Sequence, residues 1–229
     1  MKIFITGGNG NLGKELIKII PKKYEVLYPS SSECDITNFD VLRNNIVSFN
    51  PDFVLHLAGF VDIVGCEKNI DKAIDTNIIG TLNLVKSCLD LDCKVVYISS
   101  EYVFKGDRGN YTINDRLDPL NIYGKTKSAA EYTISILPNY QIIRAPFIKT
   151  KYPKVYTDQY CSRYFLEDVV NKIFYNIINN SNKIIHIANS RNTLYNHYID
   201  KKLNPLPIKI PDNIKSITPK DTSLIDNSI

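Results

Sequence analysis

A serine, a tyrosine and a lysine near the middle of the chain have the residue types and spacing of an acid–base catalyst. Ser100 follows the apolar run 94–99, which is typical of a strand, and Tyr123 and Lys127 lie four residues apart at the start of an expected helix. The two side chains therefore share one helical face. A free tyrosine has a pKa of about 10, and a lysine ammonium together with a nicotinamide cation would lower it. The serine hydroxyl could then polarise a substrate carbonyl while the tyrosine gives a proton and a nicotinamide gives a hydride.

The start of the chain, MKIFITGGNGNLG, predicts a site for such a cofactor. Lys2–Thr6 is an apolar, β-branched run that indicates a buried strand, and Asn11–Ile20 carries apolar residues at helical spacing. Gly7, Gly10 and Gly13 mark the turn between them with the spacing G-x-x-G-x-x-G. We expect Gly7 to allow the tight turn, Gly10 to let a pyrophosphate approach the backbone, and Gly13 to let the helix lie close to the sheet. The free amides of the helix N-terminus would bind the phosphates.

The rest of the chain continues to alternate strands with helices. Further strands are expected at 24–28, 53–57, 94–99, 141–145 and 183–188, and further helices at 39–49, 71–91, 121–137 and 165–178. This alternation predicts an α/β fold with a doubly wound parallel sheet of the Rossmann type. We expect residues 1–148 to form the NAD(P)-binding core. Residues 149–229 would supply a lobe, the sixth strand and a mostly irregular tail from Lys202 onward, which complete the fold.

Composition and charge argue against several other classes of protein. The chain has 229 residues and a net charge of +4, but its lysines are scattered and lack the interleaved aromatic residues and arginines of a nucleic-acid groove. No run approaches the roughly 18 apolar residues of a membrane span. The five cysteines include no C-x-x-C pair and no histidine at ligand spacing, so we expect free thiols and no metal site. Because the first strand leaves no room for a targeting peptide, we expect a cytoplasmic protein.

The segment after the second expected strand bears on the choice between NAD(H) and NADP(H). NAD-specific Rossmann folds usually place an acidic residue there, whereas this chain has Pro29 followed by Ser30–Ser32. Small hydroxyl side chains tolerate or bind a 2′-phosphate, so either cofactor is possible and NADPH is slightly favoured. The alternative is that these serines are only loop residues.

The third expected strand also ends at the ligand edge of the sheet. Ala58 and Gly59 follow it, and small residues at this edge leave space for a ligand. His56 lies inside the apolar run of the same strand. We interpret it as a core histidine rather than a catalytic one.

These motifs together resemble the extended short-chain dehydrogenase/reductase family, and within it the reductases of nucleotide-linked sugars. The resemblance covers nearly the whole chain and is specific through residue 145. The segments that carry it are the Gly7/Gly10/Gly13 loop, Cys34–Thr37, Pro51–Asp52, Ala58–Gly59, Asn77–Gly80, Ser99–Phe104, Gly109–Tyr111, Pro119–Lys127 and Pro219–Leu224.

The resemblance implies a role for each residue that matches a family motif. Ser100 takes the position of the catalytic serine or threonine, Tyr123 that of the proton donor and Lys127 that of its partner. The family's cofactor-binding positions correspond to Gly7, Asn9, Gly10, Asn11, Leu12, Asp35, Ile36, Ala58, Gly59, Asn77 and Lys127. Of these, Asp35 and Ile36 would contact the adenine, and Asn77 would support the lysine. The family's substrate-binding positions correspond to Glu101, Tyr102 and Arg144.

The activity that the resemblance implies is reduction of a nucleotide-linked 4-keto-6-deoxy sugar. A hydride would pass from NAD(P)H to the C4 ketone, with Tyr123 as proton donor, and the helices at 71–91 and 121–137 could pair in a homodimer. Two departures from the family matter. Glu101 stands where the epimerase–reductases of the superfamily carry a cysteine, which disfavours a built-in epimerase. The part after Ile148 is short, so we expect a reduced substrate-binding lobe.

Two alternatives stay open from the sequence. The same tyrosine and lysine would serve a sugar-nucleotide epimerase or dehydratase that keeps NAD bound and recycles the hydride. The short lobe also fits a non-catalytic NADP-binding subunit, similar to the regulatory β subunit of methionine adenosyltransferase, which keeps the fold and serves a partner protein.

Overall fold

A six-stranded sheet runs through the centre of the computed structural model, which describes residues 1–229. The strand order is β10-β5-β4-β3-β1-β2, and every neighbouring pair is parallel. The strands are β1 (Lys2–Thr6), β2 (Glu25–Leu27), β3 (Phe53–His56), β4 (Lys94–Ser99), β5 (Tyr140–Arg144) and β10 (Ile184–His186). All lie close to their expected ranges, so the predicted Rossmann-type sheet is confirmed.

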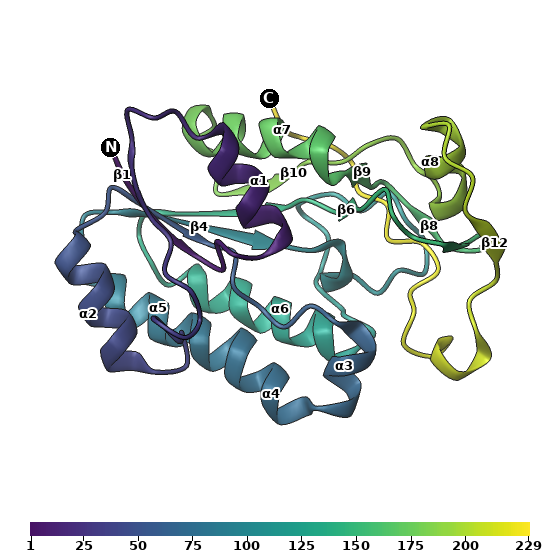
Figure 1. The fold of residues 1–229 in the computed structure, drawn as a ribbon. Coiled ribbons are helices and arrows are strands. Elements are labelled where there is room, and N and C mark those ends of the chain that lie inside the picture. The colour runs from purple at the N-terminus through teal and green to yellow at the C-terminus, as the bar shows by residue number, and fades with distance from the viewer.

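Helices cover both faces of this sheet (Figure 1). On one face lie α1 (Asn11–Ile19) and α7 (Leu166–Asn179), and on the other lie α2 (Phe39–Phe49), α5 (Gly80–Cys88) and α6 (Ile122–Ile134). The two cores follow from the alternation of side chains along each strand. In β4, Val96 and Ile98 join the core beneath α1 and α7, whereas Val95 and Tyr97 join the core beneath α5 and α6. None of the helices has the length and apolar character that crossing a membrane requires.

The helix expected at 71–91 is not a regular α-helix. It consists of α4 (Ile70–Ile74), a π-helical segment (Asp75–Ile79) and α5, and a further short helix, α3 (Ile63–Lys68), precedes it. The wide π turn contains Asn77, which is the buried residue of this segment. Such turns occur often at functional sites.

Short strand pairs and one helix build a small lobe beside the sheet. These elements are β6 (Phe147–Ile148) with β9 (Tyr164–Phe165), β7 (Lys154–Tyr156) with β12 (Leu206–Ile208), β8 (Tyr160–Cys161) with β11 (Asn192–Thr193), and α8 (Leu194–Asp200). The lobe has a core of its own, formed by Ile148, Val155, Cys161, Phe165, Leu194 and Tyr198. Beyond Lys202 only β12 and one 3₁₀ turn are regular, which confirms the irregular tail. The domain boundary at residue 148 stays a prediction.

Candidate active site

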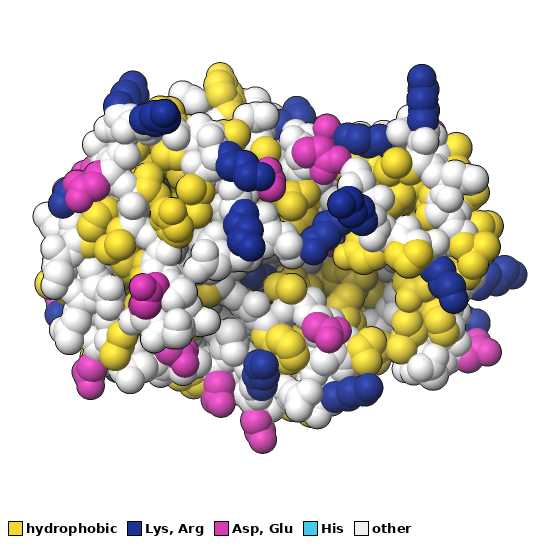
Figure 2. All heavy atoms as spheres, in the orientation of Figure 1, with side chains coloured by type: hydrophobic (Ala, Val, Ile, Leu, Met, Phe, Trp, Pro, Cys, Tyr) yellow, Lys and Arg dark blue, Asp and Glu magenta, His cyan; other side chains and the backbone are white.

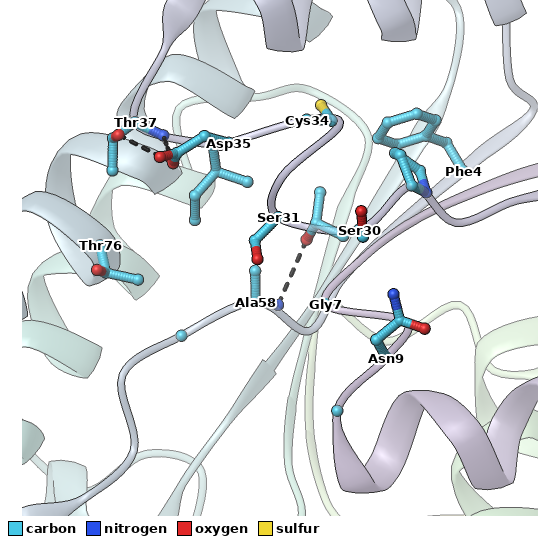
Figure 3. A pocket seen from close by; sticks show the side chains of 15 residues that line it. Phe4, Gly7, Asn9, Ser30, Ser31, Cys34, Asp35, Thr37, Ala58 and Thr76 are labelled. Atoms are coloured by element: carbon cyan, nitrogen blue, oxygen red, sulfur yellow. Dashed lines mark hydrogen bonds between the residues drawn. The ribbon is translucent and has the colours of Figure 1, made fainter.

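A groove crosses the carboxyl ends of the strands, the edge where open parallel sheets bind ligands. It consists of two neighbouring cavities of about 390 and 370 Å³ that share Gly7, Gly10 and Gly59 on their walls. Figure 3 shows the first cavity, and the face drawn in Figure 2 is hollowed near its centre. Among the residues expected in the site, the first cavity is lined by Gly7, Asn9, Gly10, Asp35, Ile36, Ala58 and Gly59. The second is lined by Gly7, Gly10, Asn11, Leu12, Gly59, Ser100, Glu101, Tyr102, Tyr123 and Lys127.

The glycine loop has the tight turn that its spacing predicts. Gly7 has a φ of +71°, and a Cβ there would lie 2.6 Å from the backbone nitrogen of Ala58. A Cβ on Gly13 would lie 2.5 Å from the carbonyl oxygen of Gly8, so α1 packs closely on the loop itself. Gly10 differs, because it lines both cavities and a Cβ there would meet only the Gly7 oxygen, at 3.1 Å. Glycine at this position therefore keeps the groove open and is not required by the packing of the fold.

The N-terminus of α1 faces the groove without a side-chain cap. Its N-cap residue is Gly10, and its first turn contains no acidic residue. Asn11 and Leu12, the first two residues of the helix, line the second cavity. The free amides and the positive end of the helix dipole suit an anionic group such as a pyrophosphate.

The first cavity has one charged side chain on its wall, that of Asp35. Its Oδ1 accepts hydrogen bonds of 2.9 Å from both the amide and the hydroxyl of Thr37 (Figure 3). Ser30 and Ser31 also line this cavity, but the Ser30 amide and hydroxyl both donate to the Glu33 carboxylate at 2.7 Å. These bonds lower the pKa of Glu33. The serines thus form a turn that holds this carboxylate, and no cation lines the cavity.

His56 is a core residue, as its place in an apolar run predicts. It is fully buried in β3, with Nδ1 2.7 Å from the Thr6 hydroxyl and Nε2 2.9 Å from the Thr81 hydroxyl. Burial, with a smaller contribution from Lys127, lowers the pKa of His56 to about 3. The neutral imidazole therefore ties β1, β3 and α5 together beneath the groove.

Asn77, expected among the cofactor-binding residues, also lies beneath the groove and lines neither cavity. Its Oδ1 accepts the Phe60 amide at 2.7 Å, and its Nδ2 donates to the Phe60 carbonyl at 3.0 Å and to the Thr126 hydroxyl at 2.9 Å. Asn77 thus holds the loop after β3 against α6, next to Lys127. Its side chain makes no hydrogen bond to the lysine itself.

The structure brings Ser100, Tyr123 and Lys127 together on the wall of the second cavity. Ser100 directly follows β4 and caps a 3₁₀ turn (Glu101–Val103) by accepting a 3.3 Å hydrogen bond from the Tyr102 amide. Tyr123 lies in the first turn of α6, and its hydroxyl is close enough to the Ser100 side chain for the serine to influence its pKa. The carboxyl end of β4 and the start of α6 therefore bring Ser100 and Tyr123 to the same wall of the cavity.

Two residues near Tyr123 fix the start of α6 against the 3₁₀ turn. Asn121 is the N-cap, and its Oδ1 accepts the amide of Gly124 at 2.8 Å. A Cβ on Gly124 would lie only 2.1 Å from the carbonyl oxygen of Tyr102. The absence of a side chain at Gly124 lets the helix approach the turn, and the Tyr102 and Tyr123 rings then pack edge to face with centroids 5.9 Å apart.

Burial governs the ionisation of both Tyr123 and Lys127. It raises the pKa of Tyr123, and the neighbouring Ser100 side chain only partly opposes this rise. The sequence predicts a tyrosine pKa lowered by Lys127 together with a nicotinamide cation, whereas in the protein without a cofactor the pKa of Tyr123 is raised. The Lys127 Nζ donates instead to the Ile98 carbonyl oxygen at 2.7 Å. Burial also lowers the pKa of Lys127 to about 7, with Glu131 opposing the shift.

Arg163, which was not expected in the site, completes the second cavity. It follows β8, lines the cavity and forms an ion pair of 2.7 Å with Glu101. It also donates to the Tyr102 hydroxyl at 3.3 Å. No sequence pattern links Arg163 to a residue 62 positions earlier. The pairing exists only because the lobe folds back over the end of β4.

Arg144, which the resemblance places beside the substrate, lies in the core instead. Its Nε and Nη2 donate to the two carboxylate oxygens of Glu131 at 2.9 and 2.7 Å, and its Nη1 lies 3.0 Å from Nε2 of His186. Arg144 and Glu131 are almost fully buried, and Arg144 lines neither cavity. The structure thus pairs Arg144 with α6 and does not bring it to the groove.

Comparisons with known proteins identify several dTDP-4-dehydrorhamnose reductases that this chain resembles. The chain is 34% identical over 151 residues to the dTDP-4-dehydrorhamnose reductase of Mycolicibacterium smegmatis, covering 64% of this chain and 46% of that protein. It is 32% identical over 145 residues to the dTDP-4-dehydrorhamnose reductase of Aggregatibacter actinomycetemcomitans, covering 62% and 49%. The chain therefore spans about half the length of the curated relatives it matches. The crystal structure of dTDP-4-dehydrorhamnose reductase from Bacillus anthracis in complex with NADP matches with a TM-score of 0.88 at 25% identity, over 99% of this chain and 90% of that one.

A comparison with protein families gives the same result over most of the chain. The model of the family described as RmlD substrate binding domain matches residues 1–192. This range contains the glycine loop and every residue that lines the two cavities, Arg163 included. The chain therefore belongs to the RmlD substrate binding domain family, within the extended short-chain dehydrogenase/reductases.

Proposed function

We propose that the protein is an NAD(P)H-dependent reductase of a nucleotide-linked 4-keto-6-deoxy sugar, of the dTDP-4-dehydrorhamnose reductase type. The observation that carries the proposal is the placement of Ser100, Tyr123 and Lys127 on one cavity that continues into the cavity of the glycine loop. Membership of the family and the names of the relatives support it. The product would be a sugar with a hydroxyl group at C4, as in dTDP-rhamnose biosynthesis.

The groove fits a dinucleotide cofactor. Gly10 leaves the backbone open, and the uncapped N-terminus of α1 offers amides at the same place. The residues that would hold the cofactor are Gly7, Asn9, Gly10, Asn11, Leu12, Asp35, Ile36, Ala58, Gly59 and Lys127. NAD(P)H, when bound, supplies the hydride. We favour NADPH, because the Glu33 carboxylate is engaged by Ser30 and because the matched B. anthracis structure contains NADP.

Residues of the chain itself would supply the proton that the substrate's carbonyl oxygen takes up. Because burial raises the pKa of Tyr123, the phenol keeps its proton at neutral pH and can donate it to the carbonyl oxygen. The Ser100 hydroxyl, which donates to Glu101 Oε2 in the structure, would turn to the same carbonyl oxygen when a substrate is bound and polarise the carbonyl. Lys127 lies one helical turn from Tyr123, where its ammonium form stabilises the phenolate that remains and can return a proton to it.

The second cavity suits a sugar joined to a diphosphate. Glu101 and Tyr102 line it beside Ser100 and offer polar partners for sugar hydroxyl groups. Lys149, also on its wall, is exposed and forms no ion pair, so its ammonium is available to a phosphate. The substrate would therefore lie with its ketone toward Tyr123 and its charged end toward Lys149.

We also propose that the protein forms a homodimer through α5 and α6. Large apolar side chains are exposed on and next to these adjacent helices, namely Leu82, Leu89, Tyr132 and Ile136. Contiguous exposed apolar surface marks interaction sites, and two neighbouring helices that each expose such residues could provide it. Light scattering should give twice the mass of one chain for the wild type and a monomer for Tyr132→Lys. A monomeric wild type would remove this part of the proposal.

A reducing compartment, such as the cytoplasm, is the setting that we propose for this activity. All five cysteines are free and buried in the structure. Proteins of oxidising compartments usually pair their cysteines in disulfides.

Purified protein tests the proposed reaction directly. With a dTDP-linked 4-keto-6-deoxy sugar and a 3,5-epimerase present, the wild type should consume NADPH in proportion to the sugar reduced. Tyr123→Phe should lower kcat roughly 100-fold or more, because the proton donor is lost, while NADPH binding is retained. Normal turnover by Tyr123→Phe would contradict the proposal.

The two alternatives predict different outcomes of the same assay. A sugar-nucleotide epimerase or dehydratase would purify with tightly bound NAD and would convert the sugar without net NADPH consumption. A regulatory subunit would reduce no sugar and would form a stable complex with a partner protein in pull-downs.

A further inference from the structure

Arg163 connects the carboxyl-terminal lobe to the turn that carries Ser100. It lies between β8 and β9, and its guanidinium reaches Glu101 and Tyr102, the two residues that follow Ser100. Its side chain is 13% exposed and lines the second cavity. A residue of the lobe thus contacts the polar wall next to the catalytic serine.

The first contact fixes the Glu101 carboxylate. Arg163 Nε and Nη2 lie 2.8 and 2.7 Å from Oε1, while Oε2 accepts the Ser100 hydroxyl at 2.9 Å. The Glu101 side chain is only 4% exposed. A carboxylate buried to this extent is strongly unfavourable without a cation beside it. The ion pair therefore keeps Glu101 in place as a hydrogen-bond acceptor beside Ser100.

The second contact fixes the direction of the Tyr102 hydroxyl. Its oxygen accepts one hydrogen bond from Gln159 Nε2 at 3.2 Å and another from Arg163 Nη2 at 3.3 Å. A phenol oxygen that already accepts two hydrogen bonds can only donate its proton to a third partner. The Tyr102 proton has no acceptor within the protein, and Tyr102 lines the second cavity. Its hydroxyl is therefore a donor available to a ligand.

We propose that Arg163 is a positioning residue that sets the hydrogen-bonding polarity of the substrate pocket, with Glu101 as acceptor and Tyr102 as donor. The ligand would present a hydroxyl group to Glu101 and an oxygen acceptor to Tyr102, as two neighbouring oxygens of a sugar do. The inference rests on the proposed function, since it takes the ligand to be a sugar. Arg163 acts through these two residues and needs no contact with the sugar itself.

Arg191 provides a matched control for substitutions at Arg163. Its guanidinium pairs with Asp221 at 2.7 Å and lies 4.3 Å from the centroid of the Tyr160 ring. Arg191 is in the same lobe but lines neither cavity. Arg163 likewise pairs with Glu101, and its guanidinium lies 5.6 Å from the centroid of the Tyr102 ring. Arg191 therefore repeats this arrangement of an arginine with a carboxylate and an aromatic ring, away from the pocket.

Steady-state kinetics with the dTDP-linked 4-keto-6-deoxy sugar test the positioning role. Arg163→Met should raise the KM for the sugar nucleotide roughly 10- to 100-fold, the effect of losing charge-assisted hydrogen bonds. The KM for NADPH should not change, and kcat should fall much less. Arg163→Lys, which keeps the cation, should recover most of the loss, and Arg191→Met should leave both KM values unchanged. The same KM for Arg163→Met, Arg191→Met and the wild type would overturn the inference.

A stability cycle separates a failure of this inference from a failure of the proposed function, since it needs no substrate. Arg163→Met should lower the Tm because it leaves the Glu101 carboxylate buried without a cation beside it, and adding Glu101→Gln should restore most of the loss. If the wild type reduces no sugar nucleotide, the proposed function fails and the cycle alone decides whether Arg163 holds Glu101. If Arg163→Met does not fold but the double variant does, the pairing is supported. Additive effects of the two substitutions would overturn it.

Discussion

The Nζ of Lys127 donates a 2.7 Å hydrogen bond to the carbonyl oxygen of Ile98, two residues before Ser100 in the chain. This bond ties the helix that carries Tyr123 to the strand that ends beside Ser100. Nζ also lies 4.1 Å from the centroid of the Tyr97 ring. The amine is thus buried between a backbone oxygen and an aromatic face, and this burial is what lowers the pKa of Lys127 to about 7.

Replacing Lys127 by methionine should change how stability depends on pH. The pKa of Lys127 is about 7 in the folded protein, against 10.5 as its ordinary value. Between these values the unfolded chain binds more protons, so native stability rises with pH. Relative to Lys127→Met, the wild type should gain roughly 2–3 kcal/mol of unfolding free energy between pH 7 and pH 9. Urea unfolding of both proteins at several pH values measures the difference, and a difference that is constant with pH would contradict the burial of a titrating amine.

His56 should produce a dependence of the same sign in a more acidic range of pH. Its pKa is about 3 in the folded protein against an ordinary 6.5, so its contribution to stability is fully present above pH 6.5 and is lost as the pH falls toward 3. Between pH 6.5 and pH 5 the wild type should lose about 2 kcal/mol more unfolding free energy than His56→Gln, which cannot titrate there. Thermal or urea unfolding of the two proteins checks this. Equal losses in both would mean that the imidazole is not kept neutral by the fold.

Local patterns were sufficient to predict the sheet. Each strand has an apolar run of its own, and the glycine loop marks one strand-to-helix turn without reference to any distant residue. The structure differs from these predictions where packing between segments distant in sequence determines the local conformation. The π-helical segment Asp75–Ile79 contains no glycine or proline that would mark an interruption of the helix, and its wide turn goes with the contacts that Asn77 makes with Phe60 and Thr126. The short strands of the lobe pair over distances that no local pattern encodes.

The site was predictable to the extent that its residues belong to short motifs. Ser100, Tyr123 and Lys127 lie next to a strand end and a helix start, so topology alone brings them together. The pairings of Arg163 with Glu101 and of Arg144 with Glu131 depend on which charged group faces which in the folded chain. An arginine in a sequence gives no indication of whether it will face a pocket or a core carboxylate.

Substitutions in the glycine loop should separate cofactor binding from folding. A Cβ on Gly10 meets one protein atom at 3.1 Å, so Gly10→Ala should fold with an unfolding free energy within about 1 kcal/mol of the wild type. It should nevertheless weaken NADPH binding about tenfold or more, because the methyl group projects into the groove. Gly13→Ala is the matched control, since its Cβ would lie 2.5 Å from a backbone oxygen and should destabilise the fold by roughly 1–3 kcal/mol. NADPH fluorescence titrations and urea unfolding measure the two effects, and unchanged NADPH affinity in Gly10→Ala would argue against the cofactor site.

Arg144 should prove to be a residue of the core and not of the substrate site. Arg144→Met removes both hydrogen bonds to Glu131 and leaves a buried carboxylate unpaired, so unfolding free energy should fall by roughly 3–5 kcal/mol. Adding Glu131→Gln removes that charge and should recover part of the loss. Because Arg144 lines neither cavity, the double variant should keep the wild-type KM for the sugar nucleotide. A raised KM in a variant of unchanged stability would instead place Arg144 at the substrate, as the family resemblance implies.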